Sequence, residues 1–178
     1  MHSRCVTLMI FMSQSGLSDA ARENDWDRWY LEHLDIMVSV PGVGSAQRFK
    51  TASRGHPPSL AMYSMSSANV FQDPYYLSVR GMGEWSSLID RQYYRRNLFD
   101  GLECAPMVTE DQVLLVADRD APAPGLAGAP WNWLECVGID RSTPYRGVAV
   151  VDRAFAQALE TASGIAIYAP ATACHRPQ

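Results

Sequence analysis

The chain has 178 residues, of which 47% are hydrophobic and 19% charged, and its formal net charge is −4. This length and apolar content suit one folded domain with a sizeable core and argue against disorder. Because 19 acidic residues outnumber 15 basic ones and the chain has no run of like charge, we do not expect nucleic acid or anionic membranes as partners. Lys50 is the single lysine, so Schiff-base chemistry has almost no candidate nucleophile.

The first part of the chain alternates between strand and helix patterns. A short apolar run with β-branched residues predicts a strand over Val6–Met12. Ser18 and Asp19 then offer an N-cap for a helix whose aromatic and aliphatic residues recur on one face as far as Val40. The following Pro41-Gly42 pair ends that helix.

Two further strands are predicted at Val43–Lys50 and Leu60–Ser66, joined by a Gly- and Pro-containing turn as an antiparallel hairpin. A second long helix is predicted from about Trp85 to Phe99. A strand over Val108–Ala117, apolar on both faces, completes the order β-α-β-β-α-β. The sequence therefore predicts an α+β, ferredoxin-like unit over residues 1–118.

The rest of the chain predicts an extension of that unit within a single domain. Residues 119–130 are rich in Ala, Pro and Gly and form a connection. A strand at Trp133–Ile139, a helix over about 144–162 and a strand at Gly164–Tyr168 follow. Because this β-α-β extension (residues 131–178) is too small to hold its own core, we expect it to pack on the first unit or on a partner subunit.

The most informative segment is Trp26–Phe49, which carries W-Y-x-x-H-L on an aromatic-rich helix, then P-G and a strand with R-F. This pattern resembles the EthD-like branch of the dimeric α/β-barrel proteins, and the resemblance extends over residues 5–118. It implies two ferredoxin-like units that close a barrel around a small-molecule pocket. Relatives of that kind include monooxygenases, isomerases, cyclases and decarboxylases, so the resemblance indicates a fold more than a reaction. Only His33 and Arg48 match positions of the motif.

A homodimer is the expected assembly for a second reason. An open ferredoxin-like sheet leaves an edge or an apolar face that needs cover. A second subunit would supply that cover, unless the extension after residue 130 supplies it within the chain.

His33 is the main candidate for chemistry. It shares the sheet-facing side of its helix with Trp26, Tyr30 and Met37. Its imidazole either bonds a backbone carbonyl in a structural role or faces an internal cavity, where it would move a proton. Histidine suits proton transfer because its ordinary pKa, about 6.5, lies near working pH. Tyr30, one turn earlier, would share that proton or bond a substrate carbonyl.

Other aromatic and arginine residues are candidates for binding the substrate. Arg48 faces the opposite side of its strand from Phe49, and so points either to solvent or a dimer contact, or into the barrel to bind a carboxylate. Arginines and tyrosines of the second helix either form surface ion pairs or hold an anion at the barrel mouth. Residues 73–83 form either a plain loop or a lid. The predicted substrate-binding residues are Trp26, Arg48, Tyr63, Tyr75, Tyr93 and Arg96.

No cofactor or metal is predicted. The four histidines lack helical metal-ligand spacing, and no nucleotide-binding motif is present. The cysteines have no paired C-x-x-C spacing, so we interpret them as small packed hydrophobes rather than zinc ligands or disulfides; they are Cys5, Cys104, Cys136 and Cys174.

The sequence thus predicts a cofactor-independent enzyme that performs acid/base chemistry on a small aromatic or carbonyl-bearing organic acid. His33 would move the proton and an arginine would bind the anionic end. The alternative is a non-catalytic, stress-associated protein whose pocket only binds a ligand. The apolar run at Cys5–Met12 is too short for a membrane span and lacks a signal-peptide cleavage site, so a cytoplasmic location is expected.

Overall fold

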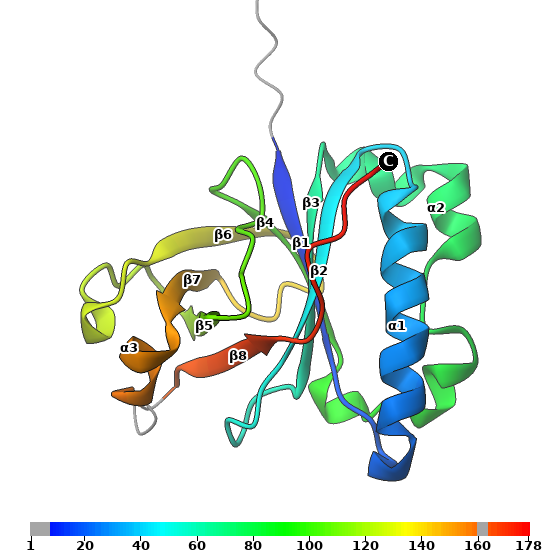
Figure 1. The fold of residues 1–178 in the computed structure, drawn as a ribbon. Coiled ribbons are helices and arrows are strands. Elements are labelled where there is room, and N and C mark those ends of the chain that lie inside the picture. The colour runs from blue at the N-terminus through cyan, green and yellow to red at the C-terminus, as the bar shows by residue number, and fades with distance from the viewer. Residues whose placement is uncertain (1–7, 160–163) are drawn as a thin grey trace, which may run out of the picture.

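Eight antiparallel strands close into a barrel in the order β1-β3-β2-β8-β5-β7-β6-β4 (Figure 1). The computed structural model describes residues 8–159 and 164–178. The strands are β1 (Met9–Ser15), β2 (Val43–Lys50), β3 (Ser59–Met65), β4 (Arg95–Asp100), β5 (Gln112–Arg119), β6 (Asn132–Ile139), β7 (Tyr145–Asp152) and β8 (Ala166–Pro170). The helices are α1 (Glu23–Val38), α2 (Pro74–Val79) and α3 (Arg153–Gln157), with short 3-10 turns between several elements.

The barrel is built from two four-stranded halves with the same internal order. In each half the first strand pairs with the third and the fourth, and the third also pairs with the second. The halves join where β2 meets β8 and where β4 meets β6. Within the described residues, one chain therefore supplies both halves of the barrel. The sheet edge whose need for cover favoured a homodimer is paired within the chain. The homodimer therefore stays a prediction, but an open sheet edge no longer supports it.

The mixed α/β class and the barrel agree with expectation, but the second long helix does not exist. Residues 83–88 and 91–93 form 3-10 turns, and β4 begins at Arg95. Along β4, Phe99 packs inside the barrel while Leu98 packs against the helices, which is the two-residue alternation of a strand. Pairing with β1 outweighs the helical pattern of this segment.

The C-terminal region likewise contains more strand than expected. The strand expected to complete the first unit corresponds to β5, and it pairs with β7 and β8. Residues 145–152, expected to begin a helix, form β7, and valine-rich G-V-A-V-V suits a strand because β-branched side chains pack well there. The predicted helix is reduced to α3, and its residues 160–163 lie outside the described part of the chain.

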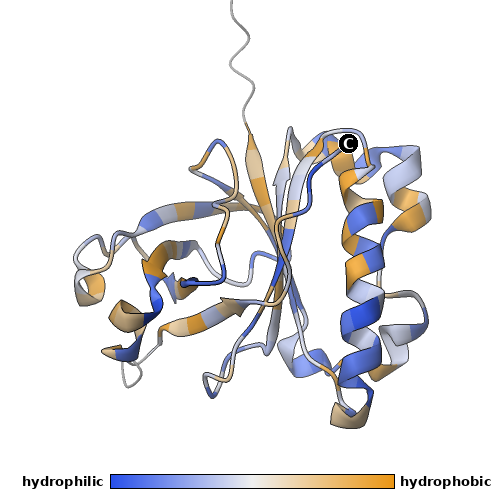
Figure 2. Cartoon of the chain, in the orientation of Figure 1, coloured by the Kyte–Doolittle hydropathy of each residue, from blue (hydrophilic) through white to orange (hydrophobic). Residues whose placement is uncertain are grey.

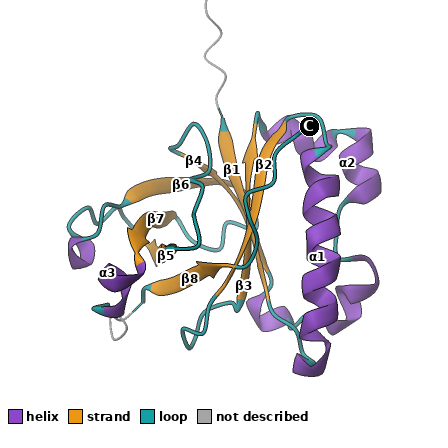
Figure 3. Cartoon of the chain, viewed as in Figure 1, coloured by secondary structure: helices purple, strands orange, loops and turns teal. Residues whose placement is uncertain are grey.

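Helices cover mainly the first half of the barrel, on the right in Figure 3. The face of α1 that meets the sheet is apolar, whereas its other face is mostly polar but also exposes Leu31 and Ile36. In Figure 2 hydrophilic and hydrophobic residues accordingly alternate along α1. Within the residues that the structure describes, α3, a 3-10 turn and the side chains of Trp131 and Trp133 cover the outer face of the second half. Apolar side chains such as Met12, Phe49 and Leu114 fill the barrel interior.

A buried polar network crosses the barrel interior and links the two halves. The guanidinium of Arg146, on β7 and fully buried, donates to Asp118 Oδ1 and Oδ2 at 2.7 and 2.8 Å and to Gln14 Oε1 of β1 at 2.9 Å. Tyr168 of β8 donates its hydroxyl to the carbonyl of Pro57 at 2.6 Å. Because the polar groups of this network satisfy one another, the network specifies how the halves meet.

Replacing Gly147 of β7 with alanine tests the packing of the second half. A Cβ at this position would lie 2.9 Å from ring atoms of both Trp131 and Trp133. We expect Gly147→Ala to lower the free energy of unfolding by about 1–3 kcal/mol in urea denaturation, because an overpacked site must shift. Gly125→Ala is the matched control, since nothing lies within 4 Å and its φ of −88° suits alanine. Equal stability of the two variants would contradict the packing described.

Candidate functional site

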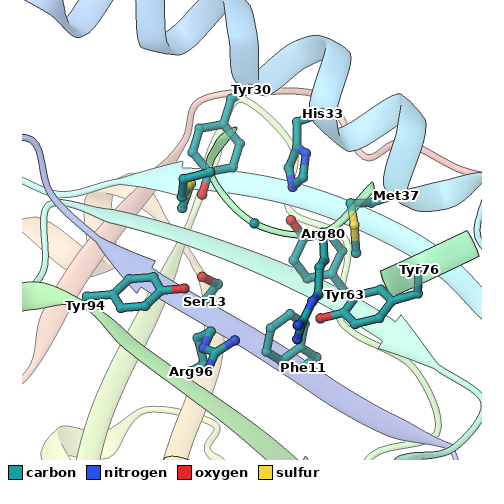
Figure 4. A pocket seen from close by; sticks show the side chains of 12 residues that line it. Phe11, Ser13, Tyr30, His33, Met37, Tyr63, Tyr76, Arg80, Tyr94 and Arg96 are labelled. Carbon is teal, nitrogen blue, oxygen red and sulfur yellow. The ribbon is translucent and has the colours of Figure 1, made fainter. Parts of the chain in front are cut away.

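A cavity of about 320 Å³ lies between the helix layer and the outer face of the first half of the barrel (Figure 4). Its size falls at the lower end of the range for small-molecule sites. Strands β1, β3 and β4, helix α1, and α2 with the loop after it surround the space. Its lining residues are Phe11 and Ser13 of β1, Tyr30, His33 and Met37 of α1, Tyr63 of β3, Tyr76, Arg80, Gly81 and Met82 of α2 and the loop after it, Tyr94 just before β4, and Arg96 of β4.

Local periodicity brings these side chains together. Tyr30, His33 and Met37 recur at three- and four-residue intervals, so they share one face of α1. Phe11 and Ser13 are two residues apart on β1 and therefore point to the same side of the sheet. Figure 4 shows the α1 side chains descending toward the sheet, with the hydroxyls of Tyr76 and Tyr94 turned toward the middle of the group.

His33 faces this cavity rather than a backbone carbonyl. Its ring stacks on Trp29, with centroids 4.5 Å apart and planes at 13°, and meets the edge of Tyr30 at 6.0 Å. Neither ring nitrogen forms a hydrogen bond with any residue that the structure describes. Burial lowers the pKa of His33 to about 4. At neutral pH the imidazole is thus uncharged and its lone pair is free, although burial makes it a weaker base than an ordinary histidine.

Two arginines give the cavity positive charge. Arg80 is exposed at its rim, while Arg96 reaches in from β4. Asp140 Oδ2 accepts the backbone N–H of Arg96 at 2.8 Å, and Asp140 Oδ1 lies 3.9 Å from Arg96 Nη2. The Nε of Arg96 is buried and has no hydrogen-bond partner among the described residues. A guanidinium with an unused N–H can bind a carboxylate or an oxyanion.

The buried tyrosines act as protonated donors. Burial raises the pKa of Tyr63 well above its ordinary value. Burial also raises the pKa of Tyr30, while the nearby charge of Arg48 opposes the shift. Both phenols therefore keep their protons at neutral pH and can donate hydrogen bonds to a ligand.

Arg48 does not line the cavity. Phe49 points into the barrel, whereas Arg48 points outward beneath α1, a choice of face that the sequence leaves open. Its guanidinium donates to Asp27 of α1 at 2.6 Å and lies 4.1 Å from the ring centroid of Tyr30. Although partial burial acts to raise the pKa of Asp27, hydrogen bonds from Lys50 and Arg48 lower it. Arg48 thus connects α1 to β2 behind the cavity.

Of the other predicted substrate-binding residues, some line the cavity and some do not. Tyr63 and Arg96 line the cavity, together with the predicted catalytic residues, whereas Trp26 is buried against the guanidinium of Arg48 at 4.6 Å. Tyr75 is exposed and its hydroxyl lies 3.1 Å from Ser39 Oγ. Tyr93 also lies outside the lining of this cavity.

Several lining residues are not among those predicted from the sequence. Ser13 and Arg80 are two of them, whereas Tyr94 is one of the tyrosines of the predicted second helix for which a surface role and an anion-binding role were left open. The two-residue alternation of β1 could have indicated Ser13, because it shares a face with Phe11. The position of Arg80 depends on the loop after α2, for which the sequence contains no comparable signal.

No cluster of three or more potential metal ligands occurs within residues 8–159 and 164–178. No helix among the described residues is long and apolar enough to cross a bilayer. The cysteines only partly match the interpretation as packed hydrophobes, since Cys136 is buried and Cys174 partly buried but Cys104 is exposed. Cys5 lies outside the described residues.

Comparison with known proteins identifies neighbours by structure alone. No family model matches the chain, and no curated protein matches its sequence. An anthrone oxidase-like protein of known structure is 11% identical, with a TM-score of 0.60, over 99% of this chain and 95% of the other. A proposed monooxygenase of Fusobacterium nucleatum is 7% identical, with a TM-score of 0.53, over 95% and 93%. A proposed chlorite dismutase is 9% identical, with a TM-score of 0.54, over 92% and 94%.

The likeness is one of fold. The dimeric α/β-barrel superfamily expected from the sequence stays a prediction, because structures of such low sequence identity show the fold alone. Identities of 7–11% carry no residue roles from one protein to another. The candidate site therefore depends on its own geometry.

The environment of His33 predicts a pH dependence of stability. Its pKa is about 4 in the folded state and about 6.5 when unfolded, so the unfolded chain binds more protons between these values. His33 therefore makes stability fall as pH is lowered from 6.5 to 4, by up to about 3 kcal/mol. His33→Phe, which keeps a ring on Trp29, should remove this component in urea titrations across that window. If the free energies of unfolding of the two proteins change with pH in parallel, the lowered pKa of His33 is contradicted.

Proposed function

We propose that the protein is a cofactor-independent enzyme whose first chemical step removes a proton from a small aromatic or carbonyl-bearing substrate. The observation that carries this proposal is the state of His33, which is uncharged at neutral pH, faces the cavity and has no hydrogen-bond partner among the described residues. A base of this kind is available for a substrate proton rather than occupied by the protein.

The surroundings of His33 suit the charge that such a step creates. When His33 accepts a proton from a carbon next to a carbonyl, or from one conjugated with the carbonyl through an aromatic ring, the C–H electron pair is delocalised onto the carbonyl oxygen and forms an enolate. Arg96 and Arg80 supply positive charge for that oxygen, and the protonated hydroxyl of Tyr63 supplies a hydrogen-bond donor. Donors placed where charge develops are worth most in a site that excludes water. Tyr30 borders the same space and would assist.

The structural neighbours support an enzyme-like role at a coarse level. They include proposed monooxygenases and an anthrone oxidase-like protein. Anthrone is a tricyclic ketone with acidic hydrogens opposite its carbonyl, so its oxidation can begin with the step proposed here. Proton removal is also the first step of many isomerisations and cyclisations, and it therefore describes the reaction class without choosing among them.

Deuterium exchange tests the role of His33. Anthrone is incubated anaerobically with the protein in D₂O, and deuterium incorporation opposite the carbonyl is followed by NMR. We expect the protein to accelerate exchange. We expect the rate with His33→Gln to be lower by at least about 100-fold, which is the usual contribution of a general base. The catalysed rate should also fall as pH drops through about 4, because His33 then becomes protonated.

His175→Gln provides the matched control. His175 pairs with Asp35 and does not line the cavity, so its replacement should leave the exchange rate unchanged. If His33→Gln accelerates deuterium exchange as much as the wild-type protein does, His33 is not the base.

Ligand binding without catalysis is the second candidate function. The observation that favours it is that no carboxylate or carbonyl among the described residues orients the imidazole of His33, which contacts the rings of Trp29 and Tyr30. Native mass spectrometry would identify a small organic molecule retained by the purified protein. If that molecule is unchanged after prolonged incubation, the binding function is the better description.

The remaining predictions concern assembly and location. A homodimer, a cytoplasmic location and membership of the EthD-like branch are predictions from the sequence. Light scattering at micromolar concentration tests the first, since a monomer would contradict it.

A further inference from the structure

A second cavity of about 220 Å³ adjoins the His33 cavity. Gly81, Met82 and Tyr94 line both, so these three residues form the partition between the two spaces. The second cavity is completed by Ser86, Ile89 and Arg91. We call the two spaces the inner chamber, which contains His33, and the outer chamber, which contains Arg91.

The outer chamber is held in place by the segment that follows α2. The backbone N–H of Asp90 donates to the carbonyl of Gly16 at 2.8 Å, and the carbonyl of Leu88 accepts the backbone N–H of Ser18 at 2.8 Å. These bonds fix the segment against the end of β1. The backbone N–H of Tyr94 donates to the carbonyl of Arg91 at 3.3 Å, so one short turn positions both the partition and the arginine.

Arg91 supplies a free positive charge in the outer chamber. Its neighbour Asp90 does not pair with it, because that carboxylate accepts the backbone N–H of Gln92 at 3.2 Å and the side-chain amide of Gln92 at 2.8 Å. Among the described residues, Arg91 forms no ion pair. An exposed guanidinium beside an apolar wall of Ile89 and Met82 suits the carboxylate end of an aromatic molecule.

The partition can admit such a molecule. Met82 is a flexible side chain that adapts to its neighbours. Gly81 adopts a φ of +92°, and apart from its own chain neighbours no atom lies within 4 Å of the point where a Cβ would stand, so no side chain closes the partition at this position. Tyr94 presents an aromatic face, already 5.6 Å from the guanidinium carbon of Arg96, on which a substrate ring can pack.

We propose that the two chambers form one site for an elongated aromatic carboxylate, with its reacting ring beside His33 and its carboxylate at Arg91. This inference refines the proposed function and rests on it, because it names the substrate class of the same site. It assigns separate tasks to the arginines: Arg96 faces the reacting part of the molecule, and Arg91 selects substrates long enough to pass Tyr94.

Equilibrium binding of two probe acids tests the proposal by calorimetry. Benzoate fits within the inner chamber, whereas 4-phenylbenzoate carries its carboxylate one ring further. We expect Arg91→Gln to weaken binding of 4-phenylbenzoate by about tenfold or more, since a charge-assisted hydrogen bond is lost. Benzoate affinity should change by less than about twofold. Ser86→Phe, which fills the outer chamber and keeps Arg91, should show the same selectivity.

Arg95→Gln is the matched control, because Arg95 is an exposed arginine of the same region that lines neither chamber. It should leave both affinities unchanged. The proposal is overturned if Arg91→Gln affects both probes equally or neither, or if 4-phenylbenzoate does not bind the wild-type protein. These outcomes are independent of His33, since binding requires no proton transfer. The selective pattern without deuterium exchange would retain the two-chamber site and reject the catalytic function.

Discussion

Closure of the barrel within one chain is the constraint on which the other features depend. An open sheet leaves unpaired backbone groups along its edge strands, and here β2 and β4 of the first half pair with β8 and β6 of the second. The buried guanidinium of Arg146 reinforces the joint, because it must reach both Asp118 and Gln14 to be satisfied. Removing either acceptor would leave a charge without full compensation in the interior.

The two halves share a strand order but differ in what covers them. The first half carries α1, long enough to place residues of three successive turns over the sheet, and the cavity forms beneath it. In the described part of the chain, the second half is covered by α3 and by bulky side chains such as Trp131, which lie directly on the sheet. Its contribution to the site is indirect, through Asp140 in the loop after β6. The residue before it, Ile139, has a φ of +63°, an unusual conformation for a β-branched residue, and Asp140 holds the backbone of Arg96.

The arginines around the site differ in whether their charges already have partners within the protein. Arg48 directs its charge to Asp27 and to the rings of Trp26 and Tyr30, and so fixes α1 to the sheet. Arg96 keeps an N–H without a partner among the described residues, and the carboxylate next to Arg91 is bonded to Gln92. The arginines of the first half therefore differ in what their guanidinium groups contact, although in the sequence they are the same residue type. Burial lowers the pKa of His33 and keeps its imidazole neutral, which is the state that a general base requires.

Local patterns in the sequence determined much of the first half. The apolar face of α1, the hairpin of β2 and β3, and the position of His33 on the sheet side of its helix follow from periodicity and turn residues, because these depend on near neighbours in the chain. The segment that carries His33 and Arg48 also led us to expect a barrel, and the strands close into one. What it could not determine was decided by tertiary pairing. Residues 95–100 are a strand because β1 and β6 lie on either side of them, and β7 is a strand because β5 and β6 pair with it. The direction of Arg48, the open face of His33 and the outer chamber at Arg91 likewise depend on contacts between segments far apart in the chain, which no local pattern records.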